Sequence, residues 1–203
     1  MPRKALIFGI LSIFGVILLI TLLNLSDNDL TLWRKRVEDI RKQTNIFLKE
    51  DVNSPMPDSL KTTFTGLNYF EIREDFRLAA RFERYQQLPQ VDSASNPNKL
   101  IPAGKIMFDY GNKTYSLHSF WRVHNKEDEL FIAFRDATNE TETYGGGRYL
   151  NLHILPNGEI ELDFNLAYNP YCAYNPRYIC PVPPKENTLP FRVEAGEKNF
   201  DTH

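Results

Sequence analysis

The chain has 203 residues, with 24 lysine and arginine residues against 26 aspartate and glutamate residues and a formal net charge of −2. This length accommodates one membrane segment and one domain of roughly 150 residues. A general nucleic-acid-binding protein needs a basic face to displace counterions from the phosphates. The slightly acidic balance therefore argues against that class, and we expect no nucleic-acid partner.

An uncharged stretch of 19 residues, Ala5–Leu23, follows Arg3 and Lys4. As a helix it spans about 28 Å, close to the ~30 Å thickness of the hydrocarbon layer. A cleavable signal peptide, the alternative, usually has a shorter apolar core of ~7–15 residues and small residues at its cleavage site. We therefore expect residues 1–25 to be a transmembrane anchor whose partner, through residues 5–23, is the lipid bilayer.

The orientation of this anchor is weakly marked, because basic residues occur on both sides of it, at positions 3–4 and 34–36. A head of only four residues is easily kept inside the cell. We expect a single-pass protein of the cell membrane with its domain outside the cytoplasm.

The next segment, residues 26–50, has the pattern of an amphipathic helix. Ser26 and Asp29 have capping-box spacing, and apolar residues follow in steps of three and four: Leu30, Trp33, Val37, Ile40 and Phe47. Such a stripe either packs on the domain or forms a short coiled coil. Residues 51–60, with Pro55 and Pro57, predict a linker, and residues 61–203 are expected to form the β domain.

Alternating patterns predict the strands of that domain. Apolar residues alternate over 76–82 and over 130–134, a polar loop is expected over 86–99, and a last short strand over 191–195. In the hairpin over 105–121, a Gly111-Asn112 turn pairs Phe108 with Tyr115 and Ile106 with Leu117.

In a second hairpin the loop length decides the register. A three-residue loop, Pro156-Asn157-Gly158, sets apolar residues opposite one another: Ile154 with Ile160, Leu152 with Leu162, and Leu150 with Phe164. It also places His153 beside Glu161. About seven short strands indicate a mainly β fold, an antiparallel sandwich or partly open barrel, preceded by one transmembrane and one amphipathic helix.

Several long strings then resemble one family closely: 131–139 (FIAFRDATN), 143–150 (TYGGGRYL), 162–165 (LDFN), 167–175 (AYNPYCAYN), 180–187 (CPVPPKEN) and 194–197 (EAGE). The chain resembles, over roughly residues 55–200, the bacterial and archaeal family catalogued as domain of unknown function 1684; residues 66–70 resemble its upstream motif. The resemblance implies export, as many members look secreted or lipid-anchored, and it implies no activity.

The same strings supply the candidate site. Gly145-Gly146-Gly147 predicts a turn into a strand over 148–155, since its spacing is not that of a phosphate loop. Around it we predict a ligand-binding surface of polar and aromatic residues: Asp136, Tyr144, Arg148, Asp163, Asn165, Tyr168, Asn169 and Tyr174. A rigid loop with two Tyr-Asn-Pro repeats contributes the last three.

Weak catalytic candidates are Asp136, Glu161 and Asp163 with His153, which would serve a carbohydrate hydrolase if two carboxylates faced a cleft. Arginine pairing, with Arg148 or Arg135, is the competing interpretation of these carboxylates. Cys172 and Cys180 are expected to form a disulfide outside the cytoplasm, with free thiols as the alternative. No metal site or cofactor is indicated.

We therefore expect a membrane-anchored ligand-binding or protein-interaction module, and the sequence favours no enzymatic activity. The alternatives are the hydrolase and a structural subunit of an envelope complex that uses the amphipathic helix as its interface.

Overall fold

The computed structural model describes residues 27–87, 100–122 and 128–200. The chain divides into two compact units, residues 1–43 and 44–203. The predicted membrane span, residues 5–23, and most of the predicted loop over 86–99 lie outside the described residues. Within the described ranges, no helix is both long enough and apolar enough to cross a bilayer.

A helix occupies residues 27–50, as the apolar spacing predicts. Its last part, from residue 44, belongs to the second unit. There Asn45 Oδ1 accepts a hydrogen bond from the backbone N–H of Leu67 at 2.9 Å. Leu48 lies in a small apolar cluster with three other buried side chains: Met56, Phe64 and Tyr174. These contacts fix the end of the helix to the domain that follows.

Residues 51–60, predicted as a linker, contain the start of a short helix, α2 (Asp58–Lys61). Ser54 Oγ donates to the carbonyl of Leu48 at 2.6 Å and accepts from the N–H of Met56 at 3.1 Å. Met56 is only 3% exposed. The helix ends at residue 50, before the two prolines, and the segment after it is packed into the second unit.

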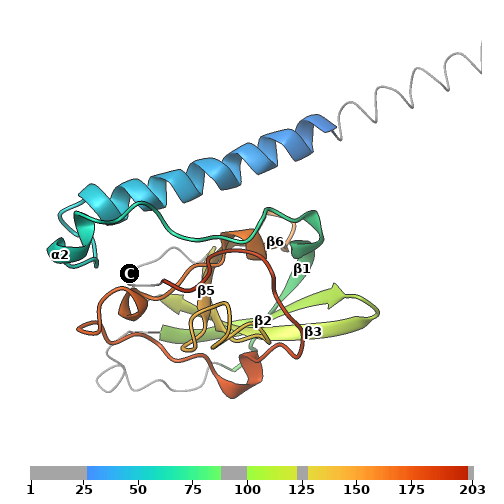
Figure 1. Cartoon of the computed structure of the whole chain (residues 1–203). Helices are drawn as coiled ribbons and strands as arrows, with labels where there is room; N and C mark the ends of the chain where they lie inside the picture. The colour runs from blue at the N-terminus through green and yellow to red at the C-terminus, as the bar shows by residue number, and fades with distance from the viewer. Residues whose placement is uncertain (1–26, 88–99, 123–127, 201–203) are drawn as a thin grey trace, which may run out of the picture. The chain divides into compact units, whose positions relative to one another are not determined.

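The described part of the second unit contains one antiparallel sheet of six strands in the order β5-β4-β3-β2-β1-β6 (Figure 1). The strands are β1 (Arg77–Arg84), β2 (Leu100–Tyr110), β3 (Lys113–Arg122), β4 (Glu129–Phe134), β5 (Arg148–His153) and β6 (Glu159–Asp163). An isolated bridge between Ile154 and Ile160 links the two edge strands. The sheet is thus a half-barrel, within the predicted mainly β class.

The first hairpin has the predicted register. Phe108 pairs with Tyr115 and Ile106 with Leu117 across β2 and β3. Gly111 provides the positive φ of the turn, +59°. Cross-strand pairing of apolar side chains on the core face specifies this register, because a slip of one residue would expose them all.

The predicted register of the second hairpin is confirmed only next to its loop. Ile154 does pair with Ile160, but Leu162 pairs with Leu78 of β1, and Leu150 pairs with Ile132 of β4. The predicted ladder from Leu152 to Leu162 is therefore wrong. The two strands diverge after the turn because each pairs with another strand, and both still direct their apolar residues into the core.

The predicted strand over 191–195 is also wrong, since this segment is irregular. In Figure 1 the C-terminal segment, orange to red, winds around the sheet with short 3-10 turns: η2 (Phe164–Leu166), η3 (Tyr171–Ala173) and η4 (Lys185–Asn187). Val193 and Ala195 are nevertheless completely buried. Side chains take the place of a neighbouring strand in satisfying the backbone here, as the next section describes.

Candidate functional site

Arg148, at the start of β5, is completely buried and organises the C-terminal segment. Its Nη1 donates to the carbonyl of Ala195 at 2.5 Å, and its Nη2 donates to the carbonyl of Val193 at 2.9 Å. Nη2 also pairs with Asp136 Oδ2 at 2.8 Å. Burial lowers the pKa of the Arg148 guanidinium, and the Asp136 carboxylate opposes that shift. The pair thus satisfies buried backbone that no strand reaches.

Asp136 completes this arrangement from the other side. Its Oδ1 accepts from the backbone N–H of Val193 at 3.1 Å and from the N–H and hydroxyl of Thr138 at 2.9 and 2.7 Å. The Thr138 hydroxyl in turn bonds to that of Thr143 at 2.8 Å. The arginine pairing considered from the sequence is therefore present, with Arg148, and it shapes the turn over 136–143.

Glu197 is the centre of a second buried polar group. It was not among the site residues predicted from the sequence. Its carboxylate accepts from Tyr174 Oη at 2.6 Å and from Asn169 Nδ2 at 2.7 Å. Burial raises the pKa of Glu197 to about 7. It belongs to the family string at 194–197, and that string was the available signal.

Asp163 and Asn165 form a third buried group, which holds another segment. Asn165 exchanges two hydrogen bonds with the backbone of Arg73, both 2.8 Å long. Asp163 Oδ1 accepts from the N–H and amide of Asn165 at 2.9 and 2.8 Å. These side chains join the chain before β1 to the end of β6.

Most of the residues predicted to form a ligand-binding surface are therefore buried inside the domain. Six of its residues are buried, with at most 6% exposure: Asp136, Arg148, Asp163, Asn165, Asn169 and Tyr174. Tyr144 and Tyr168 are partly exposed. The Tyr168 hydroxyl accepts a hydrogen bond from Asn151 at 2.9 Å. These buried residues therefore support the fold and do not form an exposed binding surface.

The carboxylates proposed for hydrolysis are each engaged by another group. Glu161 pairs with Arg77 at 2.7 Å, while Asp136 and Asp163 have the partners given above. His153 lies opposite Glu129 of β4 and not beside Glu161, so the predicted His153–Glu161 pair is wrong. A glycosidase needs two carboxyl groups facing one bond, and these contacts do not provide that arrangement.

Both cysteines are free thiols in the structure, so the expected disulfide is not formed in it. They are nevertheless neighbours, because the backbone N–H of Cys172 donates to Cys180 Sγ at 3.2 Å. Burial raises the pKa of the Cys180 thiol to about 11. A thiol that stays protonated at neutral pH is a poor nucleophile, which argues for a structural role.

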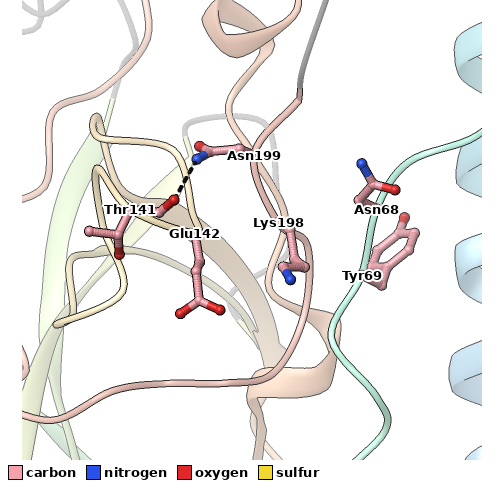
Figure 2. A pocket seen from close by; sticks show the side chains of 6 residues that line it. All are labelled: Asn68, Tyr69, Thr141, Glu142, Lys198 and Asn199. Carbon is pink, nitrogen blue, oxygen red and sulfur yellow. Dashed lines mark hydrogen bonds between the residues drawn. The ribbon is translucent and has the colours of Figure 1, made fainter.

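In front of the buried scaffold lies a cavity of about 380 Å³ (Figure 2). Three short segments line it with side chains that can all form hydrogen bonds: Asn68 and Tyr69, Thr141 and Glu142, and Lys198 and Asn199. Figure 2 shows Lys198 and Asn199 on the segment between the other two. None of these six was predicted as a site residue, although each lies inside or close to a family string.

Backbone hydrogen bonds hold the three segments together. The N–H of Lys198 donates to the carbonyl of Asn68 at 2.8 Å, and the N–H of Asn199 donates to that of Glu142 at 2.9 Å. Asn169 Nδ2 donates to the carbonyl of Lys198 at 2.8 Å. The buried Glu197–Asn169 pair therefore fixes the position of Lys198, and the cavity walls are preorganised.

The charges in the cavity are unevenly compensated. Glu142 is paired with Arg192. The Lys198 ammonium lies 4.8 Å from the centre of the Phe70 ring and has no carboxylate partner among the described residues. A ligand in this cavity would meet amides, hydroxyls, the Lys198 cation and the Glu142 carboxylate, whose charge Arg192 compensates. Across the three described ranges, no cluster of histidine, cysteine or acidic residues could hold a metal ion.

Comparison with known proteins shows that the chain matches a described family. The sequence model described as "Protein of unknown function (DUF1684)" matches residues 62–198. The solution NMR structure of an uncharacterized protein from gene locus rrnAC0354 of Haloarcula marismortui is similar, with 34% identity and a TM-score of 0.69. The match covers 87% of this chain and all of that one. No curated protein matches. All six residues of the cavity lie within or next to the family match.

Proposed function

Because the chain belongs to the DUF1684 family, whose description assigns no activity, we propose a function from geometry: this domain binds a small, hydroxyl-rich ligand. The ligand occupies the cavity between Asn68 and Thr141, and Lys198 receives an acidic group on it. A saccharide carrying a carboxylate, such as a uronic acid, has this chemistry.

The observation that carries the proposal is a polar cavity built on a rigid buried network. Its volume, about 380 Å³, is at the lower end of typical ligand sites of ~300–1,000 Å³. Two amides and two hydroxyls offer donors and acceptors from all three segments that line the cavity. The Tyr69 ring adds an apolar face, the usual complement to the C–H face of a sugar.

Titration calorimetry on the full chain in lipid nanodiscs tests this function, with glucuronate and glucose as probes. We expect glucuronate to bind, and Lys198→Met to weaken it about tenfold while leaving the weaker binding of glucose unchanged, because only the charged hydrogen bond is lost. Lys113→Met, at the first residue of β3, is the matched control and should change neither affinity. Absence of binding by both sugars would refute the proposal.

We propose in addition that residues 5–23 anchor the chain in the membrane with the domain outside the cytoplasm. The uncharged stretch of 19 residues supports this location. An oxidising compartment would also convert the adjacent Cys172 and Cys180 thiols into the disulfide that the sequence suggests. A membrane-impermeant maleimide, applied to intact cells after reduction, should then label both cysteines. Labelling only after lysis would place the domain inside.

A further inference from the structure

A second cavity, of about 300 Å³, shares no residue with the first. It lies among the ends of β1, β2 and β3 and is lined largely by apolar side chains, Pro102, Phe120 and Pro184. Four polar residues also line it, Tyr85, Gln87, His118 and Ser119, and two of them, Tyr85 and His118, form a pair. An apolar cavity with a few convergent polar groups is the usual form of a site for a small organic ligand.

The polar pair is fixed in place. The Tyr85 hydroxyl and His118 Nδ1 are hydrogen-bonded to each other. Beneath them the buried side chain of Asn187 accepts from the N–H of His118 at 2.6 Å and donates to its carbonyl at 2.9 Å. Asn187 also donates to the carbonyl of Ala133 at 2.8 Å. The imidazole is thus held by β3, by Tyr85 and, through its backbone, by η4.

The protonation of the pair follows from its surroundings. Burial raises the pKa of Tyr85, and the nearby Glu186 acts in the same direction. Burial and then Lys105 lower the pKa of His118, while Glu186 opposes them. Both groups are therefore neutral at neutral pH. We assign the Tyr85 phenol as the donor to Nδ1, because a phenol is more acidic than a neutral imidazole N–H. The single proton of the imidazole then lies on Nε2.

His118 Nε2 has no hydrogen-bond partner among the described residues. We propose that this cavity is a second binding site, for a small apolar molecule carrying a carbonyl group. The carbonyl oxygen accepts a hydrogen bond from His118 Nε2–H, and the apolar body packs against Pro102, Phe120 and Pro184. The neighbouring Ser119 hydroxyl is buried and donates to the carbonyl of Gly104 at 3.1 Å, so it is not a free donor to this ligand.

Two isosteric probes test the proposal: cyclohexanone, and methylenecyclohexane, in which a CH₂ group replaces the oxygen. Nitrogen-15 NMR of the full chain in nanodiscs reports the His118 side chain directly. We expect cyclohexanone to shift Nε2 saturably and to bind about tenfold more tightly than methylenecyclohexane. The two probes partition differently into lipid, so each affinity is referred to the free aqueous concentration of its probe, measured on protein-free nanodiscs.

Tyr85→Phe removes the hydroxyl that fixes the tautomer, and it should reduce the preference for cyclohexanone at least threefold. His118→Ala should abolish the preference while both probes still bind. Equal affinity of the two probes for the wild-type protein, or no saturable shift at His118, would overturn the proposal. Because that comparison uses only wild-type protein, it remains decisive even if a variant fails to fold.

Discussion

At the level of single residues, several polar side chains that the sequence suggested as ligand contacts instead hold the backbone of the C-terminal segment. Asp136, Arg148 and Asn169 are polar residues in the strings that resemble the family, yet each is buried and bonded to backbone of the C-terminal segment. Pairing of Asp136 with an arginine could be anticipated from the sequence. Their burial could not, because it depends on a long irregular segment that no periodic pattern reveals.

The first residue-level prediction concerns Arg148. Replacing it with alanine leaves the Asp136 carboxylate buried without its charge partner, which typically costs about 3–5 kcal/mol. Urea unfolding of the full chain measures the loss. Glu161→Gln breaks the partly exposed pair with Arg77 and should cost less than about 1 kcal/mol. Equal effects of the two changes would contradict the structural role assigned to Arg148.

The second concerns Glu197 and pH. Its pKa is about 7 in the folded protein and 4.5 as an unperturbed group. The folded state therefore binds the proton more tightly, so stability from this group is full below pH 4.5 and is lost as pH rises to about 7. The total is about 3 kcal/mol. Unfolding of Glu197→Gln should lack this loss, while a slope like that of the wild type would contradict it.

At the level of elements, local turn chemistry was predictable and strand partners were less so. The Gly111 hairpin has its predicted register because a tight turn joins β2 directly to β3 and their apolar residues face each other across the ladder. The strand around Leu162 instead pairs with β1, which is far away in sequence. Period-two patterning specifies which face of a strand is buried, and it does not specify the neighbour.

The turn into β5 gives an element-level prediction. Gly147 has φ +91°, and a Cβ there would lie 2.5 Å from the carbonyl oxygen of Phe134. Gly147→Ala therefore adds an overpacking cost of about 1–3 kcal/mol to the cost of the positive φ. Gly158→Ala, with φ +82° and open space, carries only the second cost, about 1 kcal/mol. Thermal unfolding that ranks the two in reverse order would count against this packing.

At the level of the whole molecule, the second unit is a half-barrel whose C-terminal segment is fastened by buried side chains. The cavity of Figure 2 forms where this segment meets residues 68–69 and 141–142. The cavity residues lie inside or close to the family strings. These strings did not identify Lys198 or Asn68, because these residues come together only through long-range backbone pairing at Lys198 and Asn199.

The most direct test of the account is an amide NMR titration of the full chain with glucuronate. We predict saturable changes in the amide chemical shifts of the six residues that line the cavity of Figure 2, and smaller changes at the buried Asp136 and Arg148. Binding that instead perturbs residues elsewhere on the domain, or no saturable shift at millimolar glucuronate, would contradict it.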